Sequence, residues 1–320
     1  MPDKQEVSLN KHWVITGANG NLGRRLVSVL ALTQDRVTAL VRSEGAAETI
    51  LASLQAVSAD ARARVQTKIL NYTDVDALKR ACEDADFVIH LVGIIKEGAG
   101  TTYADAHEAS TRALCAALAQ RPDVHVTYLS IYGSRPDSDN ACLASKGRAE
   151  VILRESSQAA CVLRVPMVLG EDDYVSQSLR GRVLKGQATG FRMASLEQPL
   201  FAGDVVRAVQ AAAAQRIDQS LDLGGPEVVS RAELSRRAGA VFGREVVTRS
   251  LPIALGKLLA GVLEVVSSHP PVTRAMLEIL DHDDEIDNTE AVETLGLGAL
   301  TSLDEMLRTS LAGDGLTLEA

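Results

Sequence analysis

Three glycines near the start of the chain have the residue type and spacing that suit the binding of a pyrophosphate. Gly17, Gly20 and Gly23 stand at G-x-x-G-x-x-G between an apolar run, 12–16, and an amphipathic run that begins near Leu22. The first glycine permits a tight turn, the second lets the backbone approach a phosphate, and the third lets a helix pack closely on a strand. Amides at the start of that helix would bind the anion. The sequence therefore predicts a dinucleotide site over 17–23, which includes Asn19, Asn21 and Leu22.

The residue expected to meet the adenosine ribose is basic. Dinucleotide folds that prefer NAD usually carry Asp or Glu at the end of the second strand, about 20 residues beyond the glycines, where it binds the ribose hydroxyls. Arg42 occupies that place in this chain. A guanidinium there can pair with a 2′-phosphate. We therefore predict NADP(H) as the cofactor, with NAD(H) as the alternative if Arg42 is only a solvated surface residue.

Short apolar runs alternate with helical patterns from residue 12 onward, which is typical of βαβ units in a parallel sheet. The fold class predicted is therefore α/β, with a Rossmann-type doubly wound parallel sheet. A helix is expected to begin at Thr73, with Asp76 as its partner in a capping box. Two predicted helices should each turn an apolar stripe toward the sheet. The first stripe is Leu22, Leu26, Val29 and Leu30, and the second is Ile50, Leu51, Leu54 and Val57. The expected strands are 12–16, 37–41, 65–70, 87–92, 124–130, 161–165 and 221–223.

The composition changes after Gly170, which predicts a second domain. We expect the Rossmann domain to span 1–170, with 200–223 returning to it, and a smaller, mostly helical substrate domain to span 171–320. Within the latter, 251–266 carries a broad apolar stripe. It is interrupted by Lys257 and Glu264 and is shorter than the roughly 20 apolar residues of a membrane span. Core packing in the smaller domain is the favoured interpretation, and a surface that docks on a membrane or a protein complex is the alternative.

Composition and charge exclude several classes of function. The chain has 320 residues, of which 46% are hydrophobic but only 3% aromatic, so its core must consist mainly of aliphatic side chains. A net charge of -9 argues against nucleic acid as a partner. The four cysteines form no C-x-x-C pair, which indicates neither a zinc site nor a disulfide framework. The first eleven residues lack the apolar or arginine-rich pattern of a targeting segment, so a cytoplasmic location is expected.

Two histidines lie among residue types that could do chemistry. His107 shares a predicted helix face with Tyr103 and Thr111, and that face should approach the reacting end of the cofactor. A lone helical histidine is more often structural than catalytic, so we do not count it as a catalytic residue. The run Asp-His-Asp-Asp-Glu at 281–285 contains metal-ligand types. Consecutive acids around one histidine more often form a solvated loop, so no metal site is predicted.

The motifs together resemble the atypical or extended short-chain dehydrogenase/reductases, in particular the NmrA-like branch that includes the accessory NADPH-binding subunit of respiratory complex I. The resemblance covers nearly the whole chain. It implies a substrate domain over the strand ends, with Arg42 and Asn71 at the adenosine end of the cofactor. It also places Leu91, Val92 and Gly93 under the middle and Ser130, Lys146 and Pro166 near the nicotinamide. The segments that carry the resemblance are 16–23, 40–42, 90–93, 145–147, 163–166, Gly170, 224–226 and 270–273.

The resemblance also implies a catalytic set that is incomplete in this chain. Catalytic members of the wider family use a Ser to polarise a carbonyl, a Tyr to donate the proton, and a Lys one helical turn further on to lower the Tyr pKa and hold the ribose. Ser130 and Lys146 match two of these positions, but Cys142 stands where the pattern has Tyr. We interpret Cys142 as a packing residue. Tyr132, two residues past Ser130, is the candidate that could replace the missing acid.

Two functions of different classes remain open. The first is an NADP(H)-dependent oxidoreductase or epimerase-like enzyme on a small organic substrate, supported by Ser130 and Lys146. The second is a binding protein that holds NADPH as a structural or sensing ligand and acts through a protein partner, supported by the absent tyrosine. The sequence favours the enzyme narrowly. The resemblance adds contact with a protein complex or with the inner-membrane surface as alternatives, while substrate identity and oligomeric state are not encoded in any motif.

Overall fold

Seven parallel strands form the central sheet of the computed structural model, which describes residues 10–98, 100–266, 273, 277–278 and 282–312. The strand order is β11-β6-β5-β4-β1-β2-β3. The chain leaves β1 toward one edge, then restarts at β4 toward the other, so the topological switch point lies between β1 and β4. The predicted doubly wound α/β fold is confirmed. The strands are β1 (His12–Thr16), β2 (Arg36–Val41), β3 (Val65–Ile69), β4 (Phe87–His90), β5 (His125–Ile131), β6 (Ala160–Val165) and β11 (Ser220–Asp222).

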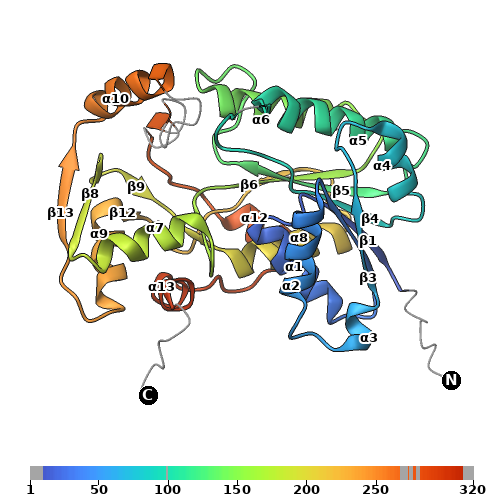
Figure 1. Cartoon of the computed structure of the whole chain (residues 1–320), viewed down its shortest axis with the longest axis horizontal. Helices are drawn as coiled ribbons and strands as arrows, with labels where there is room; N and C mark the ends of the chain where they lie inside the picture. Colours follow the sequence, from blue (N-terminus) through green and yellow to red (C-terminus); the bar gives the residue numbers. More distant parts are fainter. Residues whose placement is uncertain (1–9, 99, 267–272, 274–276, 279–281, 313–320) are drawn as a thin grey trace.

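Helices cover both faces of this sheet and bury two aliphatic layers against it (Figure 1). One layer contains α1 (Asn21–Ala31), α2 (Glu44–Ser53), α8 (Ala202–Ala214) and α12 (Thr289–Leu295). The other contains α4 (Val75–Ala81), α5 (Ser110–Leu118) and α6 (Ala141–Arg154). A short helix, α3 (Ala59–Arg62), precedes β3, and a π-helix, η1 (Ala104–Ala109), leads into α5.

A second hydrophobic core lies beyond Val168, in the region expected to form the smaller domain. It is built by helices and by three two-stranded pairs, β10-β7, β12-β9 and β13-β8. The helix α8 packs in the first core and β11 belongs to the main sheet, while the division of the chain into two domains stays a prediction. The helix α12 also packs on the first core, through Ala291 and Leu295, which the sequence did not indicate. The elements of this region are β7 (Val168–Leu169), α7 (Tyr174–Val183), β8 (Gln187–Phe191), β9 (Leu196–Glu197), β10 (Leu200–Phe201), β12 (Val229–Ser230), α9 (Arg231–Ala240), β13 (Val247–Leu251), α10 (Ile253–Val266) and α13 (Leu303–Leu311).

Some local predictions are wrong in detail. The cap of α4 is Asp74, whose carboxylate accepts from the Ala77 amide (2.9 Å), so the proposed Thr73 capping box does not form. Val29 and Leu51 are 40% and 61% exposed, although both were assigned to stripes that face the sheet. Each is adjacent in sequence to a buried residue, and neighbouring residues on an α-helix point about 100° apart. The buried stripes are therefore narrower than the runs of apolar residues suggest.

The apolar stripe on α10 is partly exposed. Leu255 and Leu258 are 51% and 67% exposed, so core packing is the wrong interpretation for these two side chains. The side chains of Leu259, Val262, Val265 and Val266 lie outside the described residues, as do residues 270–272 of the family-like segment 270–273. Among the helices that the structure describes, none combines the length and apolar character needed to cross a membrane.

Candidate functional site

The residues predicted to bind a cofactor lie at the carboxyl ends of the central strands. Gly17 follows β1, Arg42 follows β2, Asn71 lies two residues past β3, and Leu91 follows β4. Pro166 follows β6 in the same way. Because the strands are parallel, these ends meet at one edge of the sheet, on either side of the switch point.

The structure gives a different reason for glycine at each of the three positions in the loop. Gly17 adopts φ +67°, and a Cβ there would lie 3.1 Å from the carbonyl carbon and oxygen of Leu91. A Cβ on Gly23 would lie 2.5 Å from the carbonyl oxygen of Ala18, so the packing of α1 on its own loop requires glycine. Gly20 is exposed, and a Cβ there would meet only the Gly17 oxygen, at 3.3 Å. Packing therefore requires glycine at positions 17 and 23, whereas Gly20 leaves free space above the loop.

The N-terminus of α1 is open to an anion. Its N-cap is Gly20, no side chain caps it, and its first turn contains no acidic residue. By contrast, α2, α6 and α7 are capped by the side chains of Ser43, Asn140 and Asp173. The first amides of a helix need acceptors, and the helix dipole favours a negative charge there. A pyrophosphate would satisfy both requirements.

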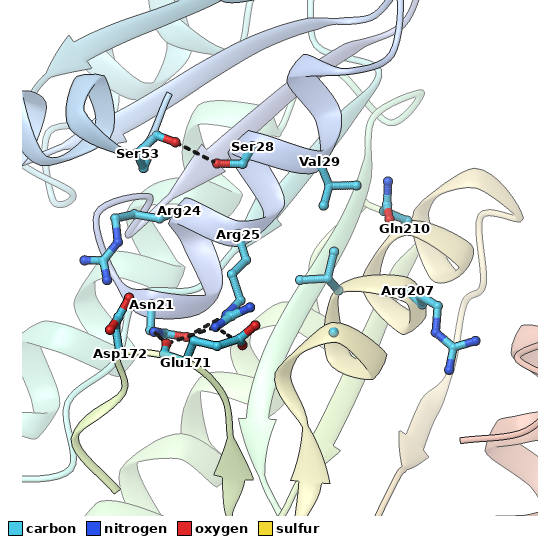
Figure 2. Close-up of a pocket in the computed structure, with 12 residues that line it drawn as sticks. Asn21, Arg24, Arg25, Ser28, Val29, Ser53, Glu171, Asp172, Arg207 and Gln210 are labelled. Atoms are coloured by element: carbon cyan, nitrogen blue, oxygen red, sulfur yellow. Dashed lines mark hydrogen bonds and ion pairs between the residues drawn. The ribbon is translucent and has the colours of Figure 1, made fainter. Parts of the chain in front are cut away.

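The side chains at the start of α1 bind the segment that follows β7. Figure 2 shows Asn21 and Arg25 pointing toward Glu171, beside a pocket of about 380 Å³ between α1 and α8. The Asn21 amide donates to the Glu171 carbonyl (2.7 Å), and Arg25 donates to the same carbonyl (2.9 Å) and forms an ion pair with the Glu171 carboxylate. The Asn21 side chain is therefore held by contacts within the protein, since its oxygen also accepts from Arg25 Nε (3.2 Å). Of the predicted site residues, Asn21 alone lines this pocket.

Arg42 and Asn71, the residues predicted at the adenosine end, are both exposed. Arg42 forms no ion pair with any residue that the structure describes, so its guanidinium is available to a ligand. The Asn71 side-chain oxygen accepts from the Thr73 amide (3.1 Å), which uses one of the lone pairs expected to meet the adenine.

Lys146 lies at the opposite end of the predicted cofactor site and is 4% exposed. Its Nζ donates to the carbonyl of Leu129 (2.9 Å) and, more weakly, to that of Val92 (3.5 Å). The ammonium also lies 4.5 Å from the centre of the Tyr128 ring, a cation–π distance. Burial lowers the pKa of Lys146 to about 8. A Cβ on Gly93 would lie 3.0 Å from Nζ, so Gly93 leaves room for this lysine.

Cys142 is fully buried one turn before Lys146 on α6, in line with the packing role predicted for it. Its thiol donates to the Ile94 carbonyl (3.5 Å), and burial raises the pKa of the thiol to about 11. The thiol therefore stays protonated at neutral pH and is a poor proton donor.

Ser130 follows Leu129, whose carbonyl binds Lys146, but the hydroxyl of Ser130 has a different partner. Ser130 is 1% exposed, and its hydroxyl donates to the buried carboxylate of Glu150 (2.5 Å), one turn further along α6. Glu150 also forms an ion pair with Arg164 on β6 (2.5 Å), which in turn lies 3.4 Å from Asp222. Sequence reasoning missed this network, because Glu150 lies in no motif and Arg164, in the family-like segment 163–166, was given no role. Catalysis by Ser130 stays a prediction, and its hydroxyl has a structural partner.

Tyr132, the candidate replacement acid, is half-buried. Burial raises the pKa of its phenol, and the nearby carboxylates of Asp222, Asp284 and Glu285 raise it further. These neighbours place the phenol near acidic residues of the later part of the chain. A proton-donor role for Tyr132 stays a prediction.

Two buried histidines complete the nicotinamide end. His107 Nε2 lies 3.1 Å from both the backbone nitrogen and the carbonyl oxygen of Ile94, and its ring stacks on Tyr103. His90 Nδ1 lies 2.7 Å from the Thr16 hydroxyl. Burial lowers the pKa of both imidazoles to about 3, with a contribution from the Lys146 charge. Both imidazoles are therefore neutral at physiological pH. The ring of His90 connects the ends of β4 and β1, and the ring of His107 binds the backbone that follows β4. The sequence places His90 in the family-like segment 90–93 but gives its side chain no role, because it ends an apolar strand.

Fold and site together define a doubly wound α/β protein with a glycine loop and an uncapped helix N-terminus at the switch point of its sheet. Residues 17–189, more than half of the chain, match the model of the NAD(P)H-binding family. The chain belongs to that family.

Known proteins support the predicted resemblance. The chain is 23% identical, over 279 residues, to the mitochondrial NADH-ubiquinone oxidoreductase 40 kDa subunit of Neurospora crassa, covering 85% of this chain and 71% of that protein. Among solved structures, the terminal R domain of the myxalamid PKS-NRPS pathway superposes with a TM-score of 0.71 (20% identity; 95% of this chain, 90% of that one). UDP-glucuronic acid 4-epimerase from Bacillus cereus, in complex with NAD, gives 0.70 (16%; 94% and 97%). The structural matches show that this chain shares the fold of these two proteins.

Proposed function

We propose that the protein binds NADP(H), with the pyrophosphate on the open N-terminus of α1 and the 2′-phosphate on Arg42. The uncapped start of α1 beneath the exposed Gly20 is the observation that carries the proposal. Arg42 adds the preference for NADP(H), because it is exposed at the end of β2 and has no acidic partner among the described residues. NAD(H), which lacks the 2′-phosphate, gains nothing from this guanidinium.

We further propose that the cofactor is held as a structural or sensing ligand rather than turned over. Three features favour this function over the enzyme that the sequence narrowly favoured. The hydroxyl of Ser130 is bound to Glu150, the thiol of Cys142 is buried with a raised pKa, and Tyr132 lies near acidic side chains. No acid of the family pattern is then poised at Lys146.

A second candidate function rests on Lys146 itself. Its pKa of about 8 is near the pH of the cell, and general acids work best in that range. In that case the protein would be a reductase in which the Lys146 ammonium protonates a small organic substrate after hydride transfer.

The non-catalytic function requires a partner, and we propose a protein complex. The exposed Leu255 and Leu258 on α10 offer an apolar surface for docking. The similarity to a protein whose name describes it as a subunit of NADH-ubiquinone oxidoreductase is in keeping with this proposal.

One set of titrations tests the cofactor proposal. NADPH and NADH are titrated into wild-type protein, Arg42→Ala and a control, Arg36→Ala, which removes an exposed arginine at the opposite end of β2. Loss of a charge-assisted pair should weaken NADPH binding roughly 10- to 100-fold in Arg42→Ala and leave NADH nearly unchanged. Equal losses for the two cofactors would contradict the assignment of Arg42.

Turnover decides between the two functions. If the cofactor is held and not turned over, wild-type protein should bind NADPH tightly and oxidise none of it in the presence of carbonyl, quinone or enone substrates. Steady oxidation that disappears in Lys146→Met would favour the reductase.

A further inference from the structure

One buried hydroxyl connects the glycine loop to the strand that carries Arg42. Tyr72 is 5% exposed and lies directly after Asn71 at the end of β3. Its Oη accepts from the Gly17 amide (2.9 Å) and donates to the Leu40 carbonyl (2.8 Å). Leu40 lies two residues before Arg42 on β2.

The same carbonyl accepts a second bond from the loop. The Ala18 amide donates to Leu40 oxygen (3.3 Å), so Gly17, Tyr72, Leu40 and Ala18 form a closed set of hydrogen bonds. This set holds the turn that begins with the positive φ of Gly17 against the end of β2. The phenol therefore adds to the pairing of β1 with β2 and to the Ala18–Leu40 bond in fixing the distance between the amides of α1 and the Arg42 backbone.

The phenol suits this position. Burial raises the pKa of Tyr72, so its hydroxyl keeps the proton that it donates to Leu40. The Arg42 charge acts on the same pKa in the opposite direction, which places the guanidinium within electrostatic reach of the phenol. Phenylalanine would fill the same space and leave the Gly17 amide and one Leu40 lone pair without this partner.

We propose that Tyr72 is a positioning residue for cofactor selectivity: it sets the glycine loop and Arg42 at the separation that lets one ligand place its pyrophosphate and its 2′-phosphate together. This inference rests on the proposed binding of NADP(H). It adds that recognition of the two phosphate groups is coupled, and that the Tyr72 hydroxyl couples them.

A double-mutant cycle measures this coupling. The factor by which Arg42→Ala weakens NADPH binding is compared in the wild-type and Tyr72→Phe backgrounds. Tyr72→Phe alone should weaken NADPH binding about tenfold, and the Arg42→Ala factor should shrink by about the same amount in its presence. A merely structural tyrosine would lower the melting temperature and leave the Arg42→Ala factor unchanged, and that result would overturn the inference.

Tyr103→Phe provides the matched control. Tyr103 is also buried, 7% exposed, and its hydroxyl donates to the Ile95 carbonyl (3.0 Å), at the nicotinamide end. The full Arg42→Ala factor should persist in this background. If wild-type protein fails to bind NADPH, the proposed function fails; if it binds and the two factors multiply independently in Tyr72→Phe, only the coupling fails.

A measurement on wild-type protein keeps the inference testable if Tyr72→Phe does not fold. Amide hydrogen exchange without ligand should be slower for Gly17, which donates to Tyr72, than for Asn21 and Leu22 at the open start of α1. Equal exchange rates for these amides would overturn the inference.

Discussion

Alanine at Gly20 and at Gly23 should separate ligand binding from folding. At Gly20 the added methyl would touch only the Gly17 oxygen, at 3.3 Å, while projecting into the space where we place the pyrophosphate. The cost to folding is that of replacing a glycine N-cap by alanine, about 0.5–1 kcal/mol. Displacing a phosphate from the helix amides forfeits a charge-assisted hydrogen bond, which corresponds to roughly 10- to 100-fold in affinity.

At Gly23 the balance is reversed. The methyl would lie 2.5 Å from the Ala18 oxygen and 2.7 Å from two further Ala18 backbone atoms, so α1 or the loop must move. Overpacking of this kind costs about 1–3 kcal/mol, partly offset by the better helix propensity of alanine. We therefore expect Gly23→Ala to lower the melting temperature by several degrees and also to impair binding.

Two assays on the same samples give the result. Thermal unfolding without ligand reports the cost to folding, and NADPH titration reports binding. Gly20→Ala with wild-type affinity would refute the placement of the pyrophosphate over Gly20. Gly23→Ala with a wild-type melting temperature would refute the packing argument.

Two other predictions concern the nicotinamide end. The pKa of Lys146 is about 8 in the folded chain, below its ordinary value of 10.5, so the unfolded chain binds more protons between these values and stability rises with pH there. Lys146→Met should therefore be more stable than wild type below pH 8, and urea unfolding should show this advantage shrinking toward pH 10.5. Ser130→Ala should lose about 1–2 kcal/mol of stability, because Glu150 loses a buried donor, without weakening NADPH binding. Loss of turnover at unchanged stability would instead make Ser130 catalytic.

The parts of the site predicted from sequence are those set by local spacing. Gly17, Gly20 and Gly23 and the position of Arg42 depend on one strand, one turn and one helix, whose order fixes their relation. The partners of Ser130 and Asn21 depend on residues 20 and 150 positions away, Glu150 and Glu171. No periodicity connects such pairs, since only the folded sheet and the second core bring them together.

Catalytic residues are harder to assign from the sequence for the same reason. A family pattern gives residue types at intervals along the chain, and Ser130 and Lys146 satisfy it in that sense. It does not report competing acceptors. A carboxylate such as Glu150 attracts a serine hydroxyl more strongly than a neutral group does, because hydrogen bonds to ionised acceptors are about twice as strong.

The two ends of the site differ in how far the chain satisfies its own polar groups. At the predicted nicotinamide end, three side chains hydrogen-bond to the backbone. Lys146 binds mainly the carbonyl of Leu129 and more weakly that of Val92. Cys142 and His107 both bind the backbone of Ile94. At the predicted adenosine end, no side chain caps the start of α1, and Arg42 is exposed. A dinucleotide gains new hydrogen bonds at the open end but must compete with existing ones at the other. Most of the binding free energy should therefore come from the phosphates, which is the distribution suited to holding a cofactor rather than to reacting with it.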